Sequence, residues 1–514
     1  MSLDRIAAHT LDRAQHASRL ALAALLATPM LVEGARASPA AQEAAQRPNI
    51  IIVYADDMGF GDLGAQNPAS KIPTPNMDRL AREGTRFNDA HSSSGICTPS
   101  RFALLTGTHH WRRFHGIVNS FEPSVFTPED VTLAELLRSC GYDTACIGKW
   151  HLGWDWAALR RAGAEPTKAA GYAPGDFDWS LAIPDGPLAH GFDHYFGDDV
   201  PNFPPYTWIR DDHVVTPPTL PLTVSPRPTE GMDESRPGPM AEGWRQDMVM
   251  PRLTARVVEW LREPARRERP FFLYWPWTAP HAPITPSGEF RGSTEAGGYG
   301  DYLHQSDAHL GQVLNTLDEL RLAGDTLVIF TSDNGPEHYA YARVRDRDHR
   351  SMGPLRGLKR DIFEGGHHVP FVVRWPGVVP AGRACSALIG QVDIWRTIAS
   401  IVGFEATGDS ARDSIDQLAV WRGEVEAARS FHVHNTFADR WAIRSGDWVL
   451  IDAADGAHSK VPDWFREREG LPRETTPGLL YDLSLDPGQR NNVFGSHPDV
   501  VASLRSLLAH ERNR

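Results

Sequence analysis

Residues 49–59 read NIIIVYADDMG, and this stretch decides the fold. A nearly continuous run of β-branched and aromatic residues predicts a strand buried on both faces, as strands are in a parallel sheet with helices on each side. The strand ends in Asp56 and Asp57, and Gly59 provides a turn signal directly after them. The stretch therefore predicts an α/β domain with acidic groups at the carboxyl end of a strand.

Strands and helices alternate along the chain after this stretch. Strands are predicted over residues 144–148, 326–331 and 370–375, and helices over residues 74–84, 132–140 and 307–323. Residues 154–244 are rich in Pro, Gly and aromatic residues and show little periodicity, which is typical of insertions that build the mouth of a site. The aromatic rings of this insertion suit sugar rings or aryl groups, or they hold long loops in place; the rings concerned are Trp154, Trp156, Trp179, Tyr206 and Trp208.

The pattern changes near the C-terminus. Short strands are predicted over residues 431–434, 440–444, 448–452 and 479–481, with a final helix over residues 498–512. We therefore expect a large central mixed, mostly parallel sheet sandwiched by helices, and a smaller C-terminal α+β domain with a short antiparallel sheet. The predicted boundaries are residues 47–425 for the first domain and 426–514 for the second.

The N-terminus resembles an export signal. Three arginines precede an apolar run over residues 20–32, and residues 35–37 (ARA) form a small-x-small cleavage site. We predict a signal peptide over residues 1–37, a linker over residues 38–46, and a periplasmic or secreted protein. The alternative is a disordered or helical N-terminal extension. The apolar run is too short to span a bilayer, so no stable membrane insertion is expected, and the net charge of −13 argues against a nucleic-acid partner.

The chain has only four cysteines. In an exported protein Cys140 could pair with Cys146, which would leave Cys97 and Cys385 free. Cys97 opens the segment CTPSR, which ends at Arg101. Taken alone, this segment favours a small core cysteine at the start of a helix, with a proline in the first turn.

Paired oxygen ligands follow two of the predicted strands. Asp333 and Asn334 follow the later strand as Asp56 and Asp57 follow the first, and Gly59 and Gly335 supply the flexibility that both turns need. Either pair alone is typical of a solvated turn. Together, four oxygen-bearing side chains without imidazole or thiolate pairs favour a hard cation, Ca²⁺ before Mg²⁺.

Candidate groups for binding an anion recur in short turn-like segments. Lys149 and His151 are two residues apart, and His281 follows the apolar run over residues 271–277. Lys359 lies in the segment RGLK. Each of these alone is better explained by a surface lysine or a hydrogen-bonded histidine.

Taken together, these motifs resemble the type I sulfatases of the alkaline phosphatase superfamily over nearly the whole chain after the leader. The motifs are DDMGFGD at 56–62, CTPSR at 97–101, LTG at 105–107, GKWHLG at 148–153, HGFD at 190–193, SDNG at 332–335 and LYDL at 480–483. The resemblance departs from the family after HGFD, where many members place a serine that helps to hold the sulfate. Asn202 is the candidate replacement here.

The resemblance implies a formylglycine-dependent sulfatase. A maturation enzyme would oxidise Cys97 to Cα-formylglycine, whose hydrated aldehyde, a geminal diol, is the nucleophile in the family. One Ca²⁺ would be held by Asp56, Asp57, Asp333, Asn334 and residue 97. The matching catalytic positions are Cys97, Arg101, Lys149, His151, His281 and Lys359. In the family's route, His281 or Lys359 protonates the leaving alcohol, and His151 takes a proton from the diol so that sulfate departs.

The implied substrate is a sulfate monoester on a sulfated carbohydrate or aryl compound. Two alternatives stay open. One is a phosphonate or phosphate ester hydrolase of the same superfamily, and the other is a non-catalytic protein that binds sulfated glycans because residue 97 is never oxidised.

Overall fold

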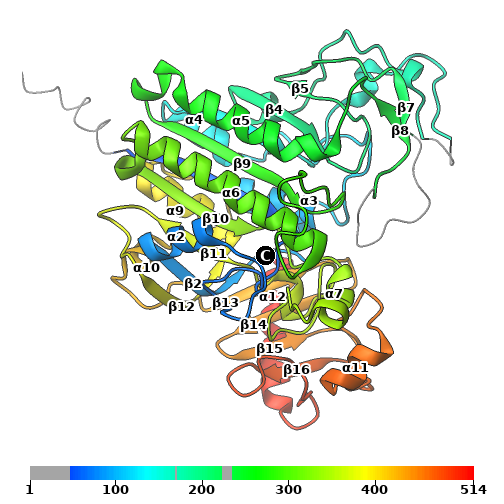
Figure 1. Ribbon diagram of the computed structural model, residues 1–514. Coiled ribbons are helices and arrows are strands. Elements are labelled where there is room, and N and C mark those ends of the chain that lie inside the picture. The colour runs from blue at the N-terminus through cyan, green and yellow to red at the C-terminus, as the bar shows by residue number, and fades with distance from the viewer. Residues whose placement is uncertain (1–46, 168–170, 223–233) are drawn as a thin grey trace, which may run out of the picture. The chain divides into compact units, whose positions relative to one another are not determined.

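The structure is a computed structural model that describes residues 47–167, 171–222 and 234–514, so the predicted leader and the predicted linker lie outside the described residues. Its main element is a ten-stranded sheet (Figure 1). In spatial order the strands are β12 (Arg383–Gly390), β2 (Thr85–His91), β11 (Phe371–Arg374), β10 (Thr326–Ser332), β1 (Asn49–Asp56), β9 (Phe271–Pro280), β3 (Asp143–Lys149), β4 (His194–Asp199), β5 (Ile209–Arg210) and β6 (His213–Val214). Only β11 and β5 run against the other strands of this sheet, which confirms the predicted mixed, mostly parallel sheet.

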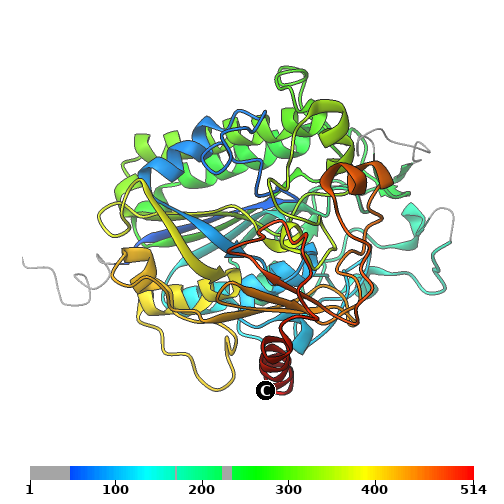
Figure 2. The same ribbon diagram turned by 90° about the horizontal axis from the view of Figure 1, so that it is seen from below.

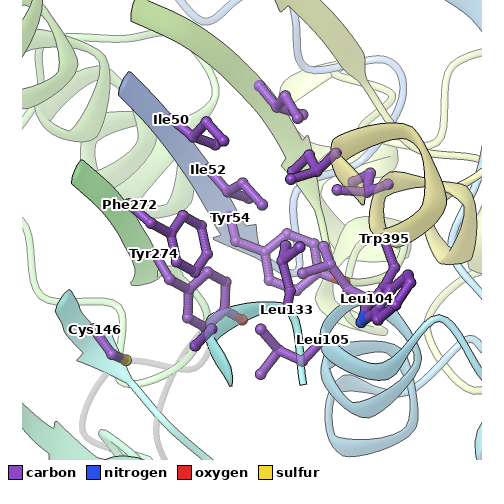
Figure 3. Packing of buried hydrophobic residues seen from close by; sticks show 14 of the residues in the cluster. Ile50, Ile52, Tyr54, Leu104, Leu105, Leu133, Cys146, Phe272, Tyr274 and Trp395 are labelled. Carbon is purple, nitrogen blue, oxygen red and sulfur yellow. The ribbon is translucent and has the colours of Figure 1, made fainter. Parts of the chain in front are cut away.

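Strand β1 shows why the sheet is covered on both sides. Ile50, Ile52 and Tyr54 belong to one apolar cluster, whereas Ile51 and Val53 belong to another. Alternate residues of a strand point to opposite faces, so each face of β1 has its own core. Figure 3 shows the first cluster, in which β1 packs against leucines of α3 and α4 and against Trp395 of α9.

Two helical layers enclose the sheet (Figure 2). Helices α3 (Cys97–Thr106), α4 (Leu133–Ser139), α9 (Ile394–Val402) and α10 (Leu418–Arg422) contribute to the first cluster. Helices α2 (Pro75–Glu83), α5 (Val249–Arg262) and α6 (Gly297–Glu319) contribute to the second. Burying one large aliphatic side chain in such a layer contributes roughly 1.5–3 kcal/mol.

Helix α6 begins ten residues before the predicted start at residue 307. Its first turns contain glycines, which lower helix propensity and obscure the pattern. Close contacts explain two of its glycines: a Cβ at Gly300 would lie 2.5 Å from Thr294 Oγ1, and one at Gly311 would lie 2.6 Å from Asn76 Oδ1. Tertiary packing therefore overrides the local signal.

The aromatic residues of the insertion are buried. Their exposed fractions are all 9% or less, for Trp154, Trp156, Trp179, Tyr206 and Trp208. All of these residues except Tyr206 belong to the two main apolar clusters. The interpretation of these rings as a sugar-binding face is therefore wrong, and they hold the insertion against the sheet instead.

A second, four-stranded sheet lies near the C-terminus, as predicted. Its strands β13 (Phe431–Asn435), β14 (Trp441–Ser445), β15 (Trp448–Ile451) and β16 (Leu479–Asp482) are all antiparallel. Helix α12 (Pro498–Asn513) packs on this sheet. The remaining helices and strands are α7 (Tyr339–Arg347), α8 (Glu364–His367), α11 (Asp463–Glu469), β7 (Leu220–Leu222) and β8 (Gly238–Met240). Both large sheets belong to one compact unit, and the division at residue 425 stays a prediction.

Two further expectations concern disulfide bonding and membrane insertion. All four cysteines lie in described parts of the chain, and each is a free thiol, so Cys140 and Cys146 are not bridged in this structure. A search of the described residues finds no helix with the length and apolarity needed to cross a membrane.

Candidate active site at the carboxyl ends of the strands

The structure brings all the predicted site residues to one edge of the large sheet. Strands β1, β3, β9 and β10 are neighbours and run parallel, so their carboxyl ends meet there. The residues placed at or after these ends are Asp56, Asp57, Lys149, His151, His281, Asp333 and Asn334. Helix α3 adds Cys97 and Arg101, and the loop before α8 adds Lys359. This edge is where open α/β sheets bind ligands.

The turn after β1 is held by the turn after β10. Asp57 has a left-handed backbone conformation with φ 65°, and its N–H donates to Asp333 Oδ1 over 3.1 Å. The expected role of Gly59 and Gly335 as flexible residues is wrong, because neither is in the left-handed region. Each is required by close backbone approach instead: a Cβ would clash with the carbonyl oxygen of Ser351 at Gly59, or of Gly365 at Gly335.

Three buried ion pairs organise the site. Lys149 Nζ lies 2.6 Å from Asp56 Oδ2, and Lys359 Nζ lies 2.8 Å from Asp57 Oδ2. The third pair joins the guanidinium of Arg101 to the Asp333 carboxylate, with Nη2 2.8 Å from Oδ2. All these side chains are at most 2% exposed. A buried carboxylate needs such a partner, because an unpaired buried charge is strongly destabilising.

The pKa values of two buried carboxylates of the site shift in opposite directions. Burial alone would raise the pKa of Asp56, but the charges of Lys149, His281 and Arg101 lower that pKa well below its usual range. Burial and the negative charge of Asp56 raise the pKa of Asp333 to about 7, although Arg101 opposes the shift. Additional positive charge beside these buried carboxylates would therefore be stabilising.

Orphaned oxygen atoms indicate where such a charge fits. Asp56 Oδ1 and Asn334 Oδ1 are buried and have no hydrogen-bond partner. Asn334 Nδ2 donates to Asp57 Oδ1 over 2.7 Å, which turns the amide oxygen away from that carboxylate. Asp56, Asp57 and His281 also present ligand atoms within 4.8 Å of one another. Carboxylate and amide oxygens are ligands of a hard cation such as Ca²⁺, so the donor set fits this ion.

Cys97 is the first residue of helix α3, preceded by Ile96 in an extended conformation. Arg101 lies four residues later, and residues four apart share one face of a helix. The Cys97 side chain is fully buried, and burial raises the pKa of its thiol even though Lys149 and Lys359 oppose the shift. An unmodified Cys97 is therefore a protonated thiol and a poor nucleophile. The helix N-terminus would favour negative charge on an oxygen at this position.

His151 has a free lone pair at the site. Its Nε2 lies 2.9 Å from the Val118 carbonyl oxygen, which can only accept, so Nε2 carries the proton. Its Nδ1 is buried and has no partner. Burial, with the charges of Lys149 and Arg101, lowers the pKa of His151 well below its usual range. His151 is thus a neutral imidazole able to accept a proton.

His281 is arranged differently. Its Nδ1 contacts the Ala282 carbonyl, so Nδ1 donates and the neutral ring presents a lone pair at Nε2. Nε2 lies 3.7 Å from Asp57 Oδ2. Burial, followed by the charge of Lys359, lowers the pKa of His281. Burial alone would lower the pKa of Lys359, but the negative charges beside it, that of Asp57 first, together raise this pKa well above its usual range, so Lys359 holds its proton.

A cavity of about 130 Å³ opens onto these groups. Its floor is formed by Asp57, His151, His281 and Lys359. The rest of its lining, here called the mouth, is largely polar and charged, namely Asn202, Glu234, Ser235, Arg236, Glu337 and Arg360, together with the apolar Ile117, Phe203 and Ala282. Asn202, the candidate replacement for the family's serine, is at the mouth, and its Oδ1 has no hydrogen-bond partner.

Charged residues at the mouth were not predicted from the sequence. Arg360 Nη1 lies 2.6 Å from Glu337 Oε2, and the Arg236 guanidinium stacks 3.7 Å from the centre of the Phe203 ring. Glu337 and Arg360 each follow closely a residue that was predicted, which is the signal that could have found them. Arg236 lies in an aperiodic insertion and has no such signal.

Comparisons with known proteins agree with this geometry. The model of the Sulfatase family matches residues 48–404. An N-acetylgalactosamine-6-O-sulfatase from Bacteroides thetaiotaomicron is 32% identical, and the match covers 91% of this chain and 94% of the relative. The steryl-sulfatase of Mus musculus is 31% identical, with 93% of this chain and 84% of the relative covered.

Solved structures give the same result. A structure from work on the metabolism of multiple glycosaminoglycans by Bacteroides thetaiotaomicron superposes with a TM-score of 0.77 and 31% identity. The match covers 91% of this chain and all of the other. The residues matched by the Sulfatase family model, 48–404, include every predicted site residue.

Proposed function

Because the chain belongs to the sulfatase family of the alkaline phosphatase superfamily and is an enzyme that hydrolyses sulfate esters of glycans, we propose that its substrate is the 6-O-sulfate ester of N-acetylgalactosamine. The mouth of the cavity is the observation that carries this proposal. Its carboxylates, guanidinium groups and amide suit the hydroxyl and acetamido groups of a sugar. A sterol would need an apolar wall in their place.

The size of the cavity indicates that the enzyme binds the terminal sugar of a glycan. Cavities for drug-sized ligands measure about 300–1,000 Å³, whereas this one measures about 130 Å³. It has room for the sulfate group and part of one sugar ring, so the rest of a glycan would lie outside. The full-length likeness to an N-acetylgalactosamine-6-O-sulfatase supports the same substrate.

Residue 97 would supply the nucleophile. A maturation enzyme would oxidise Cys97 to formylglycine, and the hydrated aldehyde provides an oxygen nucleophile that the buried thiol cannot. Arg101, one helical turn away, would stabilise negative charge on that oxygen. The fixed position of residue 97 at the first turn of α3 would aim the oxygen at the floor of the cavity.

The acidic residues of the site would hold one Ca²⁺. The ligands would be Asp56, Asp57, Asp333 and Asn334, with the oxidised residue 97 as the fifth. The ion would offset negative charge on the sulfate oxygens as a Lewis acid. Lys149 and Lys359, which pair with Asp56 and Asp57, would contribute positive charge to the same sulfate.

Two groups would move the protons of the reaction. His151 would accept a proton at Nδ1, which is free because Nε2 donates to the Val118 carbonyl. The Lys359 ammonium would donate to the leaving oxygen of the sugar. His281 could do so only after protonation at Nε2, because its Nδ1–H already contacts the Ala282 carbonyl. Lys359 is therefore the better proton donor in this arrangement.

Export would bring the enzyme to such a substrate. The predicted signal peptide over residues 1–37 favours a periplasmic or secreted enzyme. N-terminal sequencing of the protein from the producing cell would identify a cleaved leader. An intact residue 1 would contradict export by this route.

Removing calcium is expected to abolish activity reversibly. A chelator should lower kcat by at least about 100-fold, because the sulfate oxygens lose their strongest source of positive charge. Arylsulfate hydrolysis before and after dialysis against chelator would measure the loss. Added Ca²⁺ should restore the rate better than Mg²⁺, since the flexible oxygen ligands suit the larger ion. Full activity in metal-free protein would contradict the proposed site.

Substrate preference tests the proposed function directly. We expect N-acetylgalactosamine 6-sulfate to be hydrolysed with a higher kcat/KM than steryl sulfate, 4-nitrophenyl phosphate or a phosphonate monoester. Ion chromatography of the released sulfate would measure hydrolysis of the sulfated substrates. A preference for the phosphonate would favour the ester hydrolase alternative. Binding of the sulfated sugar without hydrolysis by fully oxidised enzyme would favour a binding protein.

The Arg360→Gln variant tests whether the mouth of the cavity recognises the sugar, and 4-nitrophenyl sulfate is the control substrate. This variant removes the partner of Glu337 at the mouth and leaves the floor residues in place. Loss of a charged hydrogen bond, about 1.5–3 kcal/mol, should lower kcat/KM about 10- to 100-fold for the sugar sulfate. The same variant should change the rate with 4-nitrophenyl sulfate far less, because that substrate lacks the sugar groups. Equal losses on both substrates would argue against sugar recognition at the mouth.

A further inference from the structure

A second cluster of metal-binding side chains lies outside the active site. His91 ends β2, His367 ends α8, and His434 lies in β13 of the C-terminal sheet. These three residues, here called the histidine triad, are at most 1% exposed. Their ring nitrogens can be placed within 4.8 Å of one another. No step of sulfate ester hydrolysis uses them.

Hydrogen bonds fix the tautomers of two members of the histidine triad. His91 Nε2 lies 2.7 Å from Asp89 Oδ1, and His367 Nε2 lies 3.2 Å from the Ile362 carbonyl oxygen. Both partners are acceptors: a carbonyl oxygen has no hydrogen to donate, and Asp89 Oδ1 also accepts from Arg444 Nη1 over 2.7 Å. Each Nε2 therefore carries its proton, and each neutral ring presents a lone pair at Nδ1.

These two lone pairs face each other. His91 Nδ1 lies 3.1 Å from His367 Nδ1. Two lone pairs at this distance repel unless a positive centre joins them, either a proton or a metal ion. Two nitrogens bound to a tetrahedral zinc at about 2.0–2.1 Å would be about 3.3 Å apart.

The third member has two unused nitrogens. Both Nδ1 and Nε2 of His434 are buried without a hydrogen-bond partner. Its ring stacks on that of His367 with the ring centres 3.7 Å apart. A turn of the His434 ring toward the other two would break no hydrogen bond. An unpaired buried imidazole is costly, so a ligand for it would be stabilising.

A carboxylate completes the surroundings. Glu364 Oε2 lies 4.0 Å from His91 Nδ1, and Glu364 Oε1 is buried without a partner. The protons that His91 and His367 donate to a carboxylate and a carbonyl are the contacts that orient histidine ligands around metals.

We propose that His91, His367 and His434 bind one Zn²⁺, with Glu364 within reach as the fourth ligand. Imidazole nitrogens with a carboxylate suit zinc, whereas calcium requires oxygen ligands. The two metal sites of the protein would therefore be chemically distinct. The closed, buried surroundings indicate a structural ion and not a catalytic one.

This ion would join the two sheets close to the active site. Its ligands come from β2, α8 and β13, and Figure 1 shows β13 near β2. The chain continues from His91 through Ser92, whose N–H donates to the His367 carbonyl over 2.9 Å, to Cys97. Zinc would thus stabilise the segment that presents residue 97.

Metal analysis of the purified full-length protein tests the proposal. The protein is incubated with Zn²⁺ in excess Ca²⁺, which occupies the oxygen-rich site, and is then desalted. We expect about one zinc per chain by mass spectrometry and a rise in Tm of about 2 °C or more. Co²⁺ in place of zinc should give the intense visible bands of a tetrahedral nitrogen site. A zinc-free wild-type protein with no cobalt bands would overturn the proposal and leave a shared proton between His91 and His367.

Neighbouring histidine variants provide the control. His434→Ala should lose the bound zinc and the rise in Tm. His432→Ala should keep both, although His432 lies on the same strand, is equally buried and stacks on His434. Equal zinc content in the two variants would overturn the assignment of ligands. If His434→Ala does not fold, the zinc content of the wild-type protein alone tests the proposed zinc site.

Discussion

Replacing Cys97 by serine is expected to lower steady-state turnover of a sulfate ester by at least about 10⁴-fold, the scale on which loss of a nucleophile is felt. A serine hydroxyl can take up one sulfate group, but it lacks the second hydroxyl of the hydrated aldehyde. His151 would therefore have no proton to remove and the sulfate would stay attached. Mass spectrometry of the peptide around residue 97 should show a serine that gains one sulfate group after incubation with substrate.

The same measurement on active wild-type protein should show the mass loss of thiol-to-aldehyde conversion at Cys97. Cys385→Ser is the matched control, because Cys385 is also buried but lies on β12, away from the carboxyl ends that form the site. That variant should retain nearly full activity. Repeated turnover by Cys97→Ser at the wild-type rate, or an unmodified thiol in active protein, would refute the proposed nucleophile.

Replacing Lys149 by methionine is expected to affect both activity and stability. Lys149 is fully buried and pairs with Asp56 over 2.6 Å. Loss of this charge should lower kcat/KM by about 10²–10³-fold, as for other preorganised groups that face developing negative charge. In calcium-free protein, the unpaired Asp56 should lower the free energy of unfolding by about 3–5 kcal/mol.

Lys71→Met is the control for this prediction, because the Lys71 side chain is 29% exposed and its ion pair with Glu295 is 4.0 Å long. Surface changes of this kind usually alter stability by less than about 0.5 kcal/mol. Urea unfolding with and without Ca²⁺ should show a smaller loss for Lys149→Met when calcium is present, since the ion would partner Asp56. A variant with wild-type kcat/KM would remove Lys149 from the catalytic groups.

The central strands could be predicted from the sequence because their pattern is local. Strand β1 is a continuous apolar run, and both of its faces are buried. Strand β2 was missed because TRFNDAH has no such run, and its polar residues are held partly by other segments: Thr85 donates to the Pro380 carbonyl, and Asp89 accepts from Arg444. The start of α6 was missed because its glycines serve contacts with Thr294 and Asn76. Long-range packing decides these cases, and it is not visible in a window of sequence.

The residues at the floor of the site could be predicted because strand ends and turns mark them. Asp56 and Asp57 follow one buried strand, and Asp333 and Asn334 follow its neighbour. Apart from Asn202, the residues of the mouth were not predicted, because they come from loops far apart in the chain. Two interpretations of the aromatic residues of the insertion stayed open for a related reason: composition places rings near a site, but only packing decides whether a ring faces the substrate or the core.

The site can be completed only late in synthesis, because β1 and α3 depend on partners from distant parts of the chain. Arg101 and Asp333, which form a buried ion pair, are separated by 232 residues. At about 5–20 residues per second, roughly 10–50 s pass between their emergence from the ribosome. The site around Cys97 is incomplete during this interval, because the turn after β10 that carries the partner of Arg101 does not yet exist. The proposed maturation enzyme therefore has a defined period in which to act on Cys97 as an unfolded segment, and faster elongation or earlier folding would leave more of the protein unmodified.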